Sequence, residues 1–180
     1  QIHGVLGHFF LQSHGVDLSN EIAVINQAEL SDTHVQLLMN DTTTTPKDTT
    51  ASAPINWKVY LHQLKLKNVS FSMQLPADSM RMEAHIGEAA IDDARADLKN
   101  QFYGLKKFLL WGTSASYDTG AAKPVDGFDA SHIAVRDVRI GLDSLLYKGR
   151  DMNAIIREFT MNEPSGLSIT SLTGWAYSND

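Results

Sequence analysis

Apolar and polar residues alternate with a period of two along several stretches of the chain. The clearest stretches have apolar residues at Leu64, Leu66, Val69, Phe71, Met73 and Leu75, and at Ile133, Val135, Val138, Ile140 and Leu142. Such alternation predicts half-buried strands of an antiparallel sheet. In each stretch the alternation slips by one residue, at Asn68 and at Asp137, and such a slip predicts a bulge or tight turn.

These two stretches also match each other, which indicates an internal repeat with an offset of 69 residues. A weaker copy runs from Ala28 to Leu37, with Asp32 at the slip. A second shared element links Gly104-Leu105 and the Trp111–Asp118 segment to Gly166-Leu167 and the Gly174–Asp180 segment. Repeats that add strands along one axis favour an elongated architecture, and about 12 strands would extend roughly 55 Å.

The sequence therefore predicts an all-β fold, an elongated antiparallel sheet curled into an open trough with internal repeats. A β-sandwich is the alternative, because strands with one apolar face can cover it in either way. We expect residues 1–180 to form one repeat-built β region cut from a longer protein. Residues 78–101 are predicted as two strands separated at Gly87.

One low-complexity stretch, residues 40–54, contains six Thr and two Pro and no large apolar side chain. It predicts an exposed loop, and we interpret it as a long hairpin connection within one sheet. Thr42 and Thr49 each follow an Asp, which resembles a general O-glycosylation acceptor pattern of some Gram-negative periplasms.

Candidate chemistry is sparse. The chain has no Cys and a net charge of −6, which excludes disulfides and thiolate metal sites and argues against nucleic acid as a partner. The spacing of His3, His8 and His14 matches no zinc signature. The carboxylates of Asp92, Asp93 and Asp97 are interpreted as a solvated face and turn. Because phosphate-loop, nucleophile-elbow and dinucleotide motifs are also missing, we expect no enzyme activity, cofactor or metal.

Three further strings carry a family resemblance. They are Ile55-Asn56-Trp57 through Tyr60, Leu64 through Phe71, and Gly104-Leu105 through Asp118. Over about residues 20–180 the chain resembles the early periplasmic region of TamB-like proteins in the AsmA/TamB superfamily. The resemblance implies a curled sheet, the β-taco, in the periplasmic part of an inner-membrane-anchored envelope protein of a Gram-negative bacterium. It also implies a bridge between the two membranes, phospholipid transport, and support of outer-membrane protein assembly. It carries over no catalytic residue.

In this interpretation one apolar surface accepts phospholipid acyl chains, and neighbouring repeats and outer-membrane assembly proteins are the further partners. The residues expected to line the groove are Leu64, Leu66, Phe71, Met73, Ile133, Val135, Ile140 and Leu142. A structural or protein-interaction scaffold without lipid is the second hypothesis. A carbohydrate-binding β-sandwich with an aromatic shelf at Trp57, Trp111 or Trp175 is the third.

Overall fold

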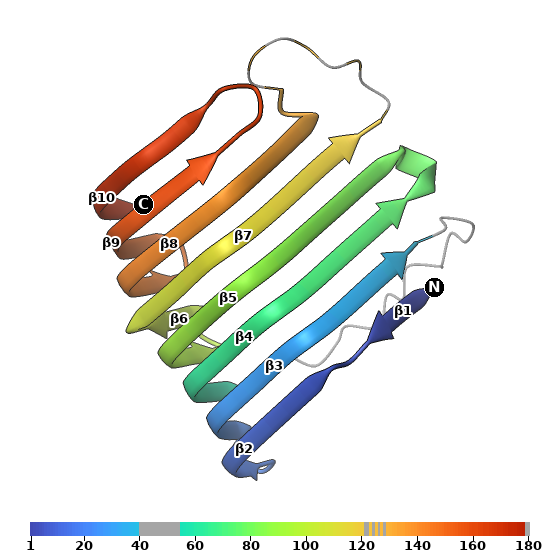
Figure 1. The fold of residues 1–180 in the computed structure, drawn as a ribbon. Coiled ribbons are helices and arrows are strands. Elements are labelled where there is room, and N and C mark those ends of the chain that lie inside the picture. Colours follow the sequence, from blue (N-terminus) through green and yellow to red (C-terminus); the bar gives the residue numbers. More distant parts are fainter. Residues whose placement is uncertain (40–54, 121–122, 124, 126, 128, 179–180) are drawn as a thin grey trace.

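The computed structural model describes residues 1–39, 55–120, 123, 125, 127 and 129–178. In this part of the chain ten strands form one mixed sheet, with a single short 3-10 helix, η1 (Pro76–Asp78), as the only helical element (Figure 1). The all-β prediction is confirmed. The strands are β1 (Ile2–Val5), β2 (His8–Asp17), β3 (Ile22–Leu38), β4 (Lys58–Leu75), β5 (Met80–Asp97), β6 (Phe102–Leu105), β7 (Lys107–Thr119), β8 (His132–Lys148), β9 (Asp151–Asn162) and β10 (Ser168–Ser178).

The sheet is eight strands wide, because β1 and β2 pair successively with β3, and β6 and β7 pair successively with β5. At about 4.8 Å per strand it extends roughly 35 Å, less than the 55 Å expected from the sequence. The strands lie side by side and turn back at one end, so the sheet is curled into a trough (Figure 1).

All neighbouring pairs are antiparallel except β3 and β4, which are parallel. The predicted hairpin between them is therefore wrong, since parallel strands need a connection that returns to the opposite end of the sheet. Residues 40–54 themselves, with the predicted exposed loop, lie outside the described residues. The parallel pairing nevertheless aligns the weak repeat copy with its parent, because Ala28, Leu30 and Val35 pair with Leu64, Leu66 and Phe71.

The first of two corners crosses the sheet at Asp32, Asn68, Gly87, Gly112 and Asp137. The slips predicted at Asn68 and Asp137 are confirmed as bends, since both residues have a positive φ, 50° and 52°. Asp32 and Gly112 share this left-handed conformation, which short Asx side chains and glycine adopt most readily. A Cβ on Gly87 would lie only 2.7 Å from the carbonyl oxygen of Gly112. Gly87 is thus the corner of one continuous strand, β5, and the two strands predicted for residues 78–101 are not found.

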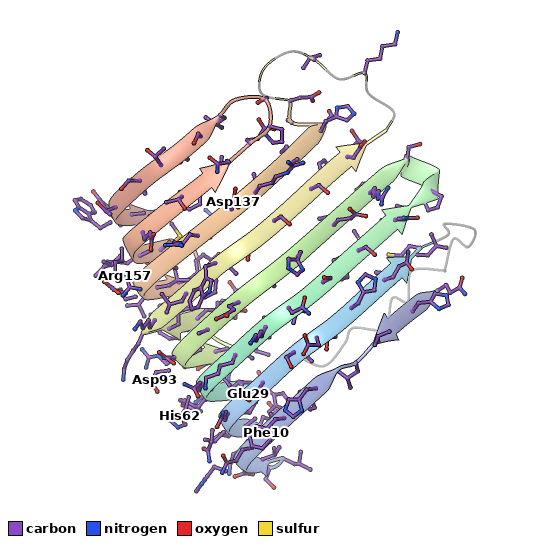
Figure 2. The ribbon with its side chains drawn as sticks, in the orientation of Figure 1. Phe10, Glu29, His62, Asp93, Asp137 and Arg157 are labelled. Carbon is purple, nitrogen blue, oxygen red and sulfur yellow. The ribbon has the colours of Figure 1, made fainter. Side chains whose placement is uncertain are left out.

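A second corner lies six residues from the first, at Asn26, His62, Asp93 and Asp143 within β3, β4, β5 and β8, and at Lys106 between β6 and β7. The pairing pattern skips these positions or shifts there, and Asp93 has a φ of 50°. Figure 2 places His62 and Asp93 where β4 and β5 turn back. The corners divide the sheet into three flanks. The first flank comprises residues 33–38, 69–75, 80–86, 113–119 and 132–136. The middle flank, between the two corners, comprises residues 27–31, 63–67, 88–92, 107–111 and 138–142. The third flank comprises residues 22–25, 58–61, 94–97, 102–105, 144–148, 151–155 and 174–178.

The trough has almost no closed core. Among the described residues none of the large side chains is fully buried, and the buried apolar residues are Ala89, Val138 and Ala154. A sandwich would bury the facing side chains of two sheets, whereas these strands form one sheet. The β-sandwich alternative is therefore not found. Thr33, Thr113 and Val138, which flank the first corner, are buried, as expected for side chains on the inner side of a bend.

Two hairpins at the outer end of the third flank share a sequence that the repeat analysis missed, Asp17-Leu-Ser-Asn20 and Asp97-Leu-Lys-Asn100. In each, the Asn side-chain amide donates to the Asp carboxylate, at 2.6 Å for Asn20 and 2.8 Å for Asn100. These hydrogen bonds lower the pKa of Asp17 and of Asp97. The second element of the predicted repeat is not reproduced, because Gly104 lies within β6 and Gly166 lies in the turn between β9 and β10.

Candidate functional site

The eight residues predicted to line a groove lie on one face of the sheet. Because paired residues of neighbouring strands point to the same side, the pairing defines apolar rows that cross the strands. Four rows contain all eight residues: Leu64–Ile91–Phe108–Leu142, Leu66–Ala89–Leu110–Ile140, Phe71–Ala84–Ala115–Val135 and Met73–Met82–Tyr117–Ile133.

The rows correct one detail of the repeat. Repeat equivalence would align Leu64 with Ile133, whereas Leu64 shares a row with Leu142. The reason is that β8 runs antiparallel to β4. Residues that precede the first corner on β4 therefore share rows with residues that follow it on β8. The prediction also missed Ile91, Phe108 and Leu110; the last two lie in the segment Phe108–Trp111, which is apolar without alternation.

The rows continue toward both edges of the sheet. Phe9 and Leu30 extend the row of Leu66 on one side, and Phe159 and Leu172 extend it on the other. Leu11 and Ala28 extend the row of Leu64 in the same way, toward β2. An apolar surface therefore crosses all eight strand positions without interruption.

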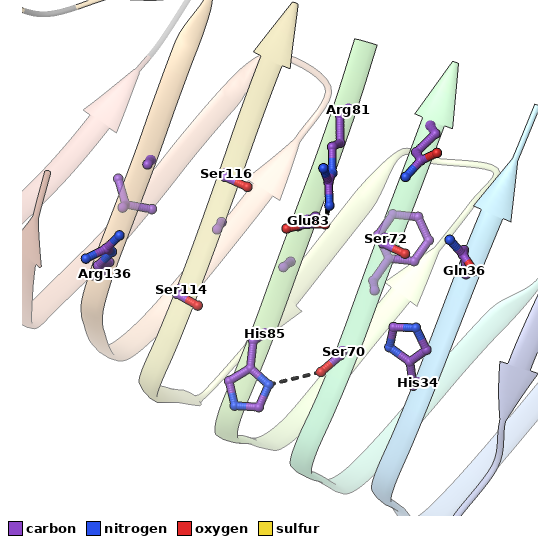
Figure 3. Close-up of a pocket in the computed structure, with 16 residues that line it drawn as sticks. His34, Gln36, Ser70, Ser72, Arg81, Glu83, His85, Ser114, Ser116 and Arg136 are labelled. Carbon is purple, nitrogen blue, oxygen red and sulfur yellow. Dashed lines mark hydrogen bonds and ion pairs between the residues drawn. The ribbon is translucent and has the colours of Figure 1, made fainter. Parts of the chain in front are cut away.

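The opposite face of the first flank is polar. A shallow hollow of 570 Å³ there is lined by His34, Gln36, Ser70, Glu83, His85 and Arg136, among others. Ser70 Oγ and His85 Nδ1 lie 3.0 Å apart. In Figure 3 these side chains stand on the near side of the flank, and the strands turn back behind it. The polar face is thus the outside of the trough, and the apolar rows line its inside.

The inner lining is only partly desolvated. Phe71 is 38% exposed and Met82 is 36% exposed, and the other seven predicted groove residues are half-buried. A packed core would cover such side chains almost completely. The lining therefore offers apolar surface that nothing in the described part of the chain covers.

Charged side chains gather outside the second corner. Lys106 Nζ lies 2.8 Å from Asp93 Oδ2, and His62 Nδ1 lies 3.1 Å from Asp93 Oδ1. The hydrogen bond from Lys106, followed by that with His62, lowers the pKa of Asp93. Across the sheet, Arg157 lies 3.7 Å from Asp143. These pairs link neighbouring segments of the sheet along the bend. Asp93 and Asp97 do not form a carboxylate cluster, because Asp93 pairs with Lys106 and His62 and Asp97 accepts a hydrogen bond from Asn100 in a turn.

The other candidate residues are dispersed. His3 lies on β1, and His8 and His14 lie on β2; the described residues contain no His, Asp and Glu group suited to a metal ion. Trp111 on the middle flank pairs with Glu88 and Trp175 on the third flank pairs with Ile155, so these two tryptophans form no common shelf. Thr42 and Thr49 lie outside the described residues. In the part of the chain that is described, no helix has the length and apolar character to cross a membrane.

Comparisons with models of known families, with curated proteins and with solved structures found no match for this chain.

Proposed function

We propose that this chain is a section of a lipid-conducting trough in an envelope protein of the AsmA/TamB type, with phospholipid acyl chains lying on the inner face of the sheet. One observation carries the proposal: apolar rows cross all eight strand positions and no second layer of described residues covers them. In this proposal the trough lies in the periplasm of a Gram-negative bacterium, between an inner-membrane anchor and the outer membrane.

The lining suits hydrocarbon. None of the side chains in the four rows is charged, so an acyl chain that lies along a row meets no ion. Each methylene removed from water contributes about 0.8 kcal/mol, so ten would contribute about 8 kcal/mol. The rows run across the strands. An acyl chain that moves along a row would therefore meet similar apolar contacts at each successive strand.

Both edges of the sheet support neighbouring repeats as partners. Phe9 and Leu11 on the β2 edge are 56% and 51% exposed, and Leu172 on the β10 edge is 40% exposed. Edge strands carry unpaired backbone N–H and C=O groups that pair readily with a further strand. Such strands would extend the apolar rows on each side. Support of outer-membrane protein assembly remains the second role in the proposal.

Site-specific photocrosslinking tests the proposal. A benzophenone side chain is placed on the inner face at Phe71 or Ile140, and on the outer face at His34 or Arg139, in the chain produced in the periplasm. We expect phospholipid adducts by mass spectrometry from the inner positions only. Adducts with protein instead of lipid at Phe71 and Ile140 would favour the scaffold hypothesis. Equal lipid labelling at His34 and Arg139 would show that the inner face is not selective.

A further inference from the structure

The outer face of the third flank differs from that of the first flank, whose hollow is lined mainly by polar and charged side chains. It exposes aromatic and aliphatic side chains in two adjacent rows: Tyr60 (41% exposed), Leu146 (45%) and Tyr177 (62%) in one, and Ile155 (47%) and Trp175 (73%) in the other. The pairing places Tyr60, Arg95, Gly104, Leu146, Asn153 and Tyr177 in one row across the flank. The groove proposed above lies on the other face and does not use these residues.

One end of this row is a hollow of 360 Å³ between Phe102 and Tyr177, a size within the range of small-ligand pockets. The ring of Tyr177 stacks on the ring of Trp175, with 5.5 Å between their centroids. Leu146 and Asn153 lie between the two aromatic walls, with Lys148 and Asp151 beside them.

A second hollow of 430 Å³ adjoins the first, since both are lined by Phe102 and Lys148. Its other lining residues include Tyr60, Lys58, Arg95 and Asn100. The guanidinium of Arg95 lies 4.4 Å from the centre of the Phe102 ring, so this aromatic wall is held in place from one side.

Aromatic side chains thus recur along the outer face of the third flank, in a shallow outer groove formed by the two hollows. Tyr60 on β4, Phe102 on β6 and Tyr177 on β10 are two and three strands apart in the sheet order, which corresponds to about 10 Å and 14 Å between their backbones. Hydrogen-bonding side chains of both signs fill the intervals: Lys58, Arg95 and Asn100 in one, Lys148, Asp151 and Asn153 in the other.

We infer that this outer groove binds a linear polysaccharide that lies across the strands. The apolar C–H face of a sugar ring packs on an aromatic ring, while its hydroxyls need donors and acceptors at the sides, and the two hollows provide both. An anionic membrane surface fits less well, because Asp97 and Asp151 lie among the basic residues and the chain has a net charge of −6. Trp175, which the sequence suggested as part of a shelf of three tryptophans, contributes here by stacking on Tyr177.

Calorimetric titration of the chain with a tetrasaccharide of β-1,4-linked N-acetylglucosamine, and with maltotetraose, tests the inference. We expect at least one of them to bind more tightly than about 1 mM. Tyr177→Ala and Phe102→Ala should each weaken binding at least tenfold. Tyr103→Ala is the matched control, because Tyr103 follows Phe102 on β6 and pairs with Tyr147 on the inner face; it should leave binding unchanged.

Binding of neither tetrasaccharide would overturn the inference, as would an equal loss in the Tyr103→Ala variant. Vesicles of phosphatidylcholine and phosphatidylglycerol that bind the same residues more tightly than either sugar would make the patch a membrane contact instead. If Phe102→Ala melts below room temperature, Trp175 serves as the probe: sugar-dependent fluorescence present in the parent must be lost in Trp175→Phe. Lipid crosslinking at Phe71 is measured separately and does not depend on these results.

Discussion

A charge introduced into the lining distinguishes an open trough from a packed core. Phe71 is 38% exposed, whereas Val138, on the same inner face beside the first corner, is 8% exposed. Complete burial of a Phe side chain is worth about 1.5–3 kcal/mol, so Phe71→Glu should remove about 1–2 kcal/mol. Its carboxylate would keep contact with water. Val138→Glu would instead bury an unpaired carboxylate, which costs several kcal/mol and threatens a marginally stable fold.

For a chain of this size 1 kcal/mol shifts the melting temperature by about 2–4 °C. Melting followed by circular dichroism should therefore show a drop of about 2–8 °C for Phe71→Glu and loss of the folded state for Val138→Glu. His34→Glu, on the outer face of the neighbouring strand, is the control and should melt like the parent. Acyl-chain crosslinking at Ile140 should fall in Phe71→Glu and stay at the parental level in His34→Glu. If Phe71→Glu unfolds the chain as Val138→Glu does, the lining is packed and the open trough is refuted.

Four further outcomes follow from the corners, turns and edges. Asn68→Gly should be tolerated, whereas Asn68→Val should lose about 1–2 kcal/mol in urea unfolding because a β-branched residue resists positive φ; equal stability would mean that the bend does not need this conformation. Gly87→Ala should destabilise the chain, since the new methyl group would meet the Gly112 carbonyl, and an unchanged melting temperature would contradict that contact. Asn100 depresses the pKa of Asp97 below its ordinary value of 3.8, so the stability from this carboxylate is present above that value and is lost as the pH falls through the depressed pKa; Asp97→Asn should flatten the acid limb of a pH–stability curve. The unpaired edges should make the chain self-associate in analytical ultracentrifugation, and a monomer at all concentrations would argue against exposed edges.

The period of two was enough to predict which residues share a face, and the slips at Asn68 and Asp137 located two of the bends. It could not predict strand direction, because alternation looks the same in a parallel and an antiparallel strand. For that reason the β3–β4 pairing and the reversed alignment of Leu64 with Leu142 were not foreseen. Gly87 was taken as a strand boundary because glycine marks breaks and corners alike.

The outer aromatic groove was beyond the sequence for a different reason. Tyr60, Phe102 and Tyr177 belong to strands that are not neighbours in sequence, and each alone resembles an ordinary strand residue. Only the curl of the sheet and the order of its strands bring Phe102 and Tyr177 to the two sides of one hollow.

Because the spacing between the two corners is constant, the length of the trough and the width of its cross-section are set independently. In the five chain segments that carry both corners, the middle flank spans six residues from corner to corner, or about 20 Å, so its width does not depend on the number of strands. Adding a strand therefore lengthens the trough by about 4.8 Å and leaves its cross-section unchanged. One residue inserted between the corners of a single strand would instead turn that strand's apolar side chains outward. A protein built on this rule can vary in reach through the number of its repeats while every section presents the same surface to whatever lies inside.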